Sequence, residues 1–191
     1  DRTCVDLDLM VPSARGALAQ AALEARGWVV EPGRARDWHV LGLSRSTAVA
    51  SLSLELHRAL DNPERGTIGY EALAPLCREM EVLGRTCLVP EPPGQLLVGA
   101  THALRHGLDV PLKSLIDIHR AVGACEGTLE ELTPLRRSPG AAATLGVMLR
   151  LCGALFGTQV PEDWSGVLAP PLLSGPLLTL SLDPTVPGYA R

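Results

Sequence analysis

A stretch close to the beginning of the chain, residues 4–11, alternates between carboxylates and aliphatic side chains. Successive side chains of a β-strand point to opposite faces, so a strand here places Asp6 and Asp8 together on one face and aliphatic residues on the other. Two residue steps along a strand separate these acids by about 7 Å, so their charges repel each other. A divalent cation with oxygen ligands offsets that repulsion, and the alternative is an edge strand with a solvated acidic face.

A second stretch, residues 51–57, has the same design, with leucines at alternate positions and polar residues between them. Glu55 and His57 share its polar face with two serines. If this strand is a neighbour of the first, Asp6, Asp8 and Glu55 converge on one surface. Such carboxylates suit Mg²⁺-dependent phosphoryl or nucleotidyl transfer, in which metal ions hold the triphosphate. His57 either contacts the nucleotide or a metal-bound carboxylate, or is a structural histidine at the end of the strand.

Five blocks of the sequence, in their order and spacing, resemble a bacterial nucleotidyltransferase-like family of the polymerase-β-type nucleotidyltransferase superfamily. The blocks are residues 5–11, 38–41, 54–60, 101–107 and 113–118, and the resemblance covers roughly residues 4–165. It implies an α+β fold in which a small mixed β-sheet of nucleotidyltransferase type is followed by a helical domain. It also implies an enzyme that moves a nucleoside monophosphate from an NTP, with AMP from ATP favoured, to a hydroxyl or phosphate acceptor on a peptide, protein or small molecule.

The resemblance also implies roles for individual residues. Asp6 and Asp8 would bind Mg²⁺, in a site with room for two metal ions, and Glu55 would be a metal ligand and candidate general base. In the helical half, a cationic residue would meet the triphosphate, and Lys113 is the only lysine in the chain. Asp117, four residues later, would position it. The alternative for Lys113 and Asp117 is an ordinary surface ion pair on a helix.

Four further residues are candidates for binding the nucleotide or the acceptor. Arg36 and His39 follow a Pro-Gly turn, and a guanidinium can bind phosphate oxygens bidentately, although a solvated loop is the alternative. His102 and His106 lie four residues apart on a predicted helix, but no third metal ligand is evident by spacing. We expect them to face a cleft between the domains or to lie at the negative end of the helix.

One feature of the superfamily is missing from the sequence. A Gly-Ser or Gly-Gly turn and a helix normally precede the first carboxylate, and Asp6 is too close to Asp1 for them. We therefore expect the first strand and helix to be absent, and the chain to be a fragment, a processed chain or a piece of a longer protein. Because that turn holds phosphates through backbone N–H groups, the alternative function is a catalytically degenerate binding module or accessory subunit of a peptide-tailoring or toxin–antitoxin system.

The composition is that of a folded globular protein, since 46% of the 191 residues are hydrophobic. With a net charge of −4, bulk electrostatic binding of nucleic acid is not expected. No apolar run is expected to reach the roughly 18 residues of a membrane span, so no membrane partner is predicted. The five cysteines are widely spaced without zinc-ligand spacing, and we expect buried free thiols in a reducing cytoplasm.

We expect three parts: a sheet domain at 1–62, a helical domain at 63–160 and a proline-rich tail at 161–191. The apolar tail would pack on this chain, on a second chain or on another copy in a homo-oligomer. A helix is predicted to start with Ser13 as its N-cap and to stop at Gly27. The other predicted elements are strands over 28–30, 38–43 and 47–57, helices over 70–80, 95–106, 111–125 and 139–157, and an extended piece over 86–89.

Overall fold

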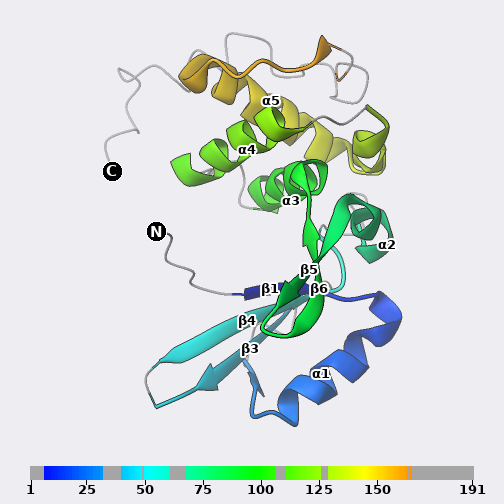
Figure 1. Ribbon diagram of the computed structural model, residues 1–191, viewed down its shortest axis with the longest axis vertical. Helices are drawn as coiled ribbons and strands as arrows, with labels where there is room; N and C mark the ends of the chain where they lie inside the picture. The colour runs from blue at the N-terminus through cyan, green and yellow to red at the C-terminus, as the bar shows by residue number, and fades with distance from the viewer. Residues whose placement is uncertain are drawn as a thin grey trace.

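The computed structural model describes residues 7–31, 40–48, 50–60, 68–105, 111–125, 129–162 and 164. This part of the chain forms a four-stranded sheet, a two-stranded hairpin and a group of helices (Figure 1), which confirms the α+β class predicted from the sequence. The elements are β1 (Leu7–Met10), η1 (Ser13–Arg15), α1 (Gly16–Glu24), β2 (Val29–Val30), β3 (Val40–Ser46), β4 (Ser51–His57), α2 (Tyr70–Leu73), η4 (Ala74–Leu76), β5 (Cys77–Val82), β6 (Arg85–Pro90), α3 (Pro92–Arg105), α4 (Leu112–Ala124), η5 (Leu129–Arg137) and α5 (Pro139–Phe156).

The four strands of the main sheet lie in the order β1-β4-β3-β2. β1 runs parallel to β4 and the other neighbours are antiparallel, so the sheet is mixed, as predicted. One face is apolar because Leu43, Leu54 and Leu56 alternate with other residues along β3 and β4. Ala19 and Leu23 of α1 pack against these leucines. The polar residues of the strands are thereby directed to the face that α1 does not cover.

The segment that contains α1 begins differently from the prediction. Pro12, not Ser13, is the N-cap of the η1 turn, and no side chain caps it. The backbone N–H of Arg15 instead donates to the Pro12 carbonyl at 2.8 Å. Proline has a fixed φ, −52° here, so it presets this turn without a side-chain cap. Gly27 has a φ of +81°, a left-handed conformation that favours glycine, and it stops the helical segment as predicted.

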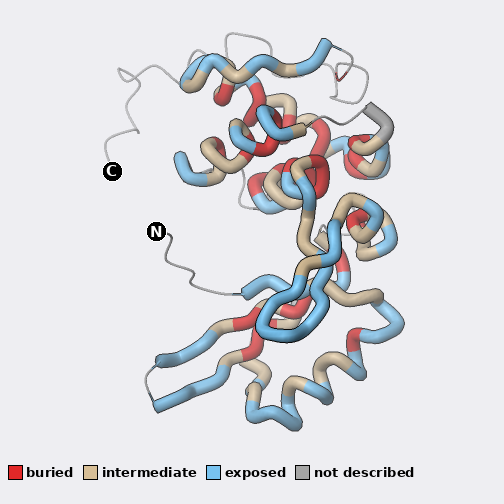
Figure 2. Tube along the Cα trace, viewed as in Figure 1, coloured by how far each residue is buried: buried red, intermediate tan, exposed pale blue. Residues whose placement is uncertain are grey.

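A second hydrophobic cluster lies among α3, α4 and α5, separate from the cluster beneath the sheet. Leu96, Leu97 and Ala100 of α3 are fully buried in it. Figure 2 shows buried residues gathered where these helices face one another. Gly99 allows a close approach, since a Cβ there would lie 2.7 Å from Cδ1 of Ile118 on α4. The division of the chain at residue 62 remains a prediction.

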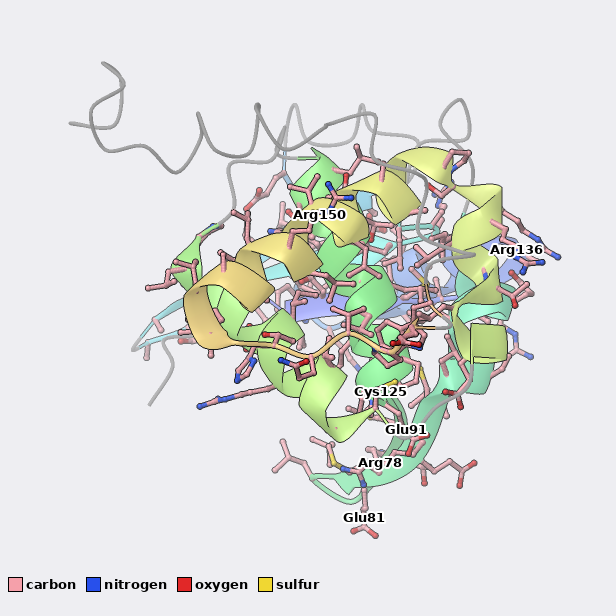
Figure 3. All side chains as sticks on the ribbon, turned by 90° about the horizontal axis from the view of Figure 1, so that it is seen from above. Arg78, Glu81, Glu91, Cys125, Arg136 and Arg150 are labelled. Carbon is pink, nitrogen blue, oxygen red and sulfur yellow. The ribbon has the colours of Figure 1, made fainter. Side chains whose placement is uncertain are left out.

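Residues 77–90 contradict the predicted helix over 70–80. The helical segment ends at Leu76, and β5 pairs with β6 as an antiparallel hairpin. Glu79, Met80 and Glu81 are good helix formers, so local preference alone suggested a helix, and cross-strand pairing overrides it. The hairpin turns through Leu83 and Gly84, whose φ values of 51° and 72° are both positive, as in a type I′ turn. Figure 3 shows the labelled Arg78 and Glu81 projecting outward from this hairpin.

The helix α5 contradicts the expectation that no segment has the dimensions of a membrane span. It has 18 residues and a mean hydropathy of 1.4, which meets the length and composition of a span. Seven of its residues are nevertheless buried within the helical cluster, among them Leu145, Met148 and Leu149. Its contacts with α3 and α4 are those of a central helix in a folded core.

The region that follows α5 packs on the helical cluster. Trp164 has no exposed surface and belongs to that cluster, so the beginning of the predicted tail packs on this chain. The rest of the predicted tail, from residue 165, lies outside the described residues. The expected contact of the tail with a second chain therefore stays a prediction.

Replacing Leu83 with asparagine should stabilise the fold. Leu83 is 98% exposed and adopts a left-handed conformation that an asparagine tolerates better than a leucine. We expect the free energy of unfolding to rise by about 0.5–1 kcal/mol in urea denaturation. Leu83→Ala, which removes the same exposed apolar group but keeps the unfavourable backbone, should give no such gain. Equal gains in both variants would contradict the turn assignment.

Two glycines should respond in opposite ways to alanine. In α3, a Cβ on Gly94 would lie 2.8 Å from the carbonyl oxygen of Leu76, and backbone cannot move aside cheaply. Gly94→Ala should therefore lower the free energy of unfolding by about 1–3 kcal/mol. In α5, a Cβ on Gly146 meets no atom within 4 Å, so Gly146→Ala should raise it by about 0.5–1 kcal/mol. Urea denaturation of the two variants measures both effects, and a stabilised Gly94→Ala protein would contradict the packing of α3 on η4.

Candidate functional site

The polar face of the main sheet carries a pair of carboxylates from two strands. In the parallel pairing of β1 with β4, Asp8 is the direct partner of Glu55. Partners in adjacent strands point to the same face, so the two side chains lie side by side, as expected if the two strands are neighbours. Asp8 is 67% exposed, whereas Glu55 on the inner strand is 19% exposed. The pair thus joins an accessible acid to one that the sheet partly covers.

The third strand places a glycine beside Glu55. Gly42 of β3 is the direct partner of Glu55 on its other side, and glycine has no side chain to fill that face. The same alternation that directs Leu41 and Leu43 toward the apolar cluster directs position 42 toward the carboxylates. Gly42 is itself buried, so this side of Glu55 is covered and not open to solvent.

His57 lies between the two acids. Its Nε2 nitrogen is 2.9 Å from Oδ1 of Asp8 and 3.4 Å from Oε2 of Glu55. Because an ionised carboxylate only accepts, the imidazole N–H donates in the contact with Asp8. His57 is 6% exposed, and its Nδ1 has no hydrogen-bond partner among the described residues. The ring is thus held by packing, with one nitrogen directed at the acids.

Asp8, Glu55 and His57 can each offer one ligand atom, and these three atoms lie within 4.8 Å of one another. Carboxylate oxygens are the ligands that Mg²⁺ and related divalent ions prefer, and imidazole nitrogen suits transition-metal ions. The donor set therefore fits a divalent cation. This cluster is the part of the predicted site that the described residues bring together.

The other candidates on described residues lie elsewhere. His102 of α3 and Lys113 of α4 are exposed, and Asp117 is half-buried one turn after Lys113. These helices lie on the side of the sheet away from α1 (Figure 1), and none of the three residues belongs to the cluster of possible metal ligands. Their proposed contact with a nucleotide stays a prediction. Asp6, Arg36, His39 and His106 lie outside the described residues.

A further histidine, His119 of α4, was not singled out from the sequence. Its Nδ1 lies 2.8 Å from the Thr158 hydroxyl, and its ring is 5.3 Å from that of Phe156. These contacts fasten the end of α5 to α4. The sequence gives no signal for this contact, because Thr158 lies 39 residues after His119 and the two residues form no recognisable motif.

The four described cysteines are free thiols, at positions 77, 87, 125 and 152, and Cys4 lies outside the described residues. Cys152 is buried as expected, but Cys87 on the hairpin is exposed, so the expectation was wrong there. Burial raises the pKa of the Cys152 thiol to about 11, and its Sγ donates to the Leu115 carbonyl. Burial, together with the Glu91 carboxylate, also raises the pKa of Cys77. Because the thiolate is the nucleophile, neither is a candidate catalytic thiol.

The rate of alkylation should distinguish the exposed Cys87 from the buried Cys152. With iodoacetamide at pH 8, Cys87 should be modified first, whereas Cys152 should stay unmodified until the protein is denatured. A thiol with a pKa near 11 is ionised to only about one part in a thousand at that pH. Peptide mapping by mass spectrometry measures both sites in one sample. Equal rates at the two sites in the folded protein would contradict the burial of Cys152.

Comparison with known proteins agrees with this architecture. A family model described as an uncharacterised nucleotidyltransferase matches residues 2–157. The match includes the sheet that carries the acidic cluster and continues through α5. No match was found among curated proteins or among solved structures. Because the matched range is well over half of the chain, the family resemblance seen in the sequence is confirmed, and the chain belongs to this nucleotidyltransferase family.

Proposed function

We propose that this chain transfers a nucleoside monophosphate from an NTP, with ATP as the favoured donor, to a hydroxyl or phosphate acceptor on a peptide, protein or small molecule. The observation that supports this most is the pair of carboxylates, Asp8 and Glu55, on the face of the sheet opposite α1 in a nucleotidyltransferase-family chain. Neighbouring acids from two strands form the kind of ligand set that holds Mg²⁺ in phosphoryl and nucleotidyl transfer.

Asp8 and Glu55 would hold the Mg²⁺, in a site with one or two ions, and the strand pattern adds Asp6 as a further ligand. Bound Mg²⁺ would neutralise charge on the triphosphate and polarise the α-phosphate. The exposed position of Asp8 leaves it open to an incoming nucleotide, whereas Glu55 lies deeper on the sheet. This difference in exposure supports different roles for Asp8 and Glu55.

Glu55 is the proposed general base. The acceptor oxygen forms a bond to the α-phosphorus of the NTP, the bond from that phosphorus to the bridging oxygen breaks, and pyrophosphate leaves. For a hydroxyl acceptor, the proton passes to the Glu55 carboxylate.

Basic residues outside the cluster would bind the phosphates or the acceptor. We assign this role to Lys113, positioned by Asp117, and to His102 and His106. Arg36 and His39 complete the proposed nucleotide contacts, and a guanidinium suits phosphate oxygens.

We also propose a cytoplasmic location. The free thiols of the described cysteines, the exposed Cys87 among them, support a reducing compartment.

The central test is calorimetric titration of the protein with ATP in the presence of Mg²⁺. Asp8→Asn should abolish Mg²⁺-dependent binding and lower nucleotide transfer at least about a hundredfold, since a catalytic metal supplies several kcal/mol of charge stabilisation. The fold should survive, because Asp8 is largely exposed, and circular dichroism checks this. Transfer is followed with α-labelled ATP against peptide, protein and small-molecule acceptors.

A matched control neutralises an acid elsewhere. Glu79 lies on the exposed hairpin and outside the cluster of possible ligands, so Glu79→Gln should bind Mg²⁺-ATP as the unaltered chain does. Unchanged nucleotide binding and transfer in Asp8→Asn would rule out the proposed site. Binding of ATP without transfer to any acceptor would instead support a catalytically degenerate binding module.

A further inference from the structure

The position of His57 separates this cluster from a site made of carboxylates alone. Its ring is buried and cannot turn outward without unpacking the end of β4. Its Nε2 therefore stays directed between Asp8 and Glu55, with contacts of 2.9 and 3.4 Å. Among the described residues, no hydrogen bond to Nδ1 forces the ring proton onto Nε2. A cation bound between the acids would take the place of the proton that Nε2 shares with Asp8; the remaining ring proton would then sit on Nδ1, and Nε2 would offer its lone pair.

The separations within the cluster match those of atoms that share one metal ion. Mg²⁺–oxygen and Zn²⁺–nitrogen bonds are about 2.1 Å long, so adjacent ligands at right angles lie about 3 Å apart. The distances from Nε2 to Oδ1 of Asp8, 2.9 Å, and to Oε2 of Glu55, 3.4 Å, lie close to that spacing. The third separation, between the acid oxygens, is within 4.8 Å, which fits ligands on adjacent or opposite sides of an ion. Only small movements of the side chains would be needed.

We infer that His57 supplies a nitrogen ligand to the cation held by Asp8 and Glu55, and that the site therefore binds a first-row transition-metal ion, probed as Mn²⁺, more tightly than Mg²⁺. This inference rests on the proposed function and specifies its metal. Mg²⁺ favours carboxylate and water oxygens, whereas an imidazole ligand favours transition-metal ions. Mn²⁺ is a suitable probe because it accepts carboxylate oxygens as readily as Mg²⁺ does.

A different role for His57 predicts a different result. If His57 only hydrogen-bonds to the acids and orients them, the cation contacts oxygen atoms alone. Its loss would then weaken Mn²⁺ and Mg²⁺ binding to a similar degree. A direct ligand must instead alter the two affinities unequally and must place a nitrogen atom on the ion.

The deciding experiment is pulsed electron paramagnetic resonance of the full chain with bound Mn²⁺. Electron spin echo modulation should show a directly coordinated ¹⁴N nucleus, and uniform labelling with ¹⁵N-histidine should replace that signal with one from ¹⁵N. The labelling uses the unaltered sequence, so it remains decisive even where a His57 variant fails to fold. His57→Gln should lose the nitrogen signal, and His119→Gln, the same change on α4 outside the cluster, should keep it.

Affinities provide the second readout. In His57→Gln the dissociation constant for Mn²⁺ should rise at least about tenfold, since changes even behind the direct ligands commonly cost 10–100-fold. The constant for Mg²⁺ should change much less. Mn²⁺ bound without any nitrogen signal, or equal losses for both ions, would overturn the inference and leave the proposed function standing. Failure of the unaltered chain to bind either ion would overturn both.

Discussion

The parallel pairing of β1 with β4 is the interaction on which the candidate site depends. In the observed register, Asp8 stands beside Glu55 on one face, while Leu7 and Leu9 stand beside Leu54 and Leu56 on the other. A slip of one residue would send each side chain of β1 to the wrong face, with Asp8 directed toward α1. Leu7 and Leu9 are themselves 51% and 38% exposed, so the hydrogen-bonded pairing with β4, more than burial of these leucines, holds the acids together.

That alignment also gathers negative charge, and the surroundings accommodate it. Two carboxylates on adjacent strands repel each other, but Asp8 remains largely in water and His57 donates a hydrogen bond to it. The helices contribute little to this arrangement directly; α1 backs the opposite face, and α3 to α5 form a separate cluster. The candidate site thus lies on the sheet, and the described helices do not supply its three possible ligands.

Much of this could be predicted from alternation in the sequence. Strict alternation over residues 51–57 predicted both the buried leucines and the polar face with Glu55, because the period of a strand is two. The pairing of that strand with the first one was an inference from their similar design. The contact of His57 with both acids could only be anticipated as one of several roles, since sequence gives the face of a side chain but not the ring orientation.

The errors arose where tertiary contacts outweigh local preference. The Glu-Met-Glu run in β5 favours a helix locally, and only pairing with β6 makes it a strand. Ser13 is a good N-cap residue, yet Pro12 sets the turn before α1. Cys87 looked like other apolar-flanked cysteines, but it lies on a hairpin with little packed against it. In the first two cases the deciding neighbour is the paired strand β6 or the preceding proline, and composition and periodicity do not reveal which interaction wins.

The hairpin and the acidic cluster also differ in how they can form. β5 and β6 meet through a turn at Leu83 and Gly84, so their pairing closes a short loop. His57 and Asp8 are separated by 49 positions, and they meet only after the intervening chain has closed the sheet. Contacts between residues so far apart in the sequence form late and slowly in folding. Occupancy of the cluster by an ion would therefore report completion of the whole sheet, and it would stabilise the native state against any intermediate in which β1 is still detached.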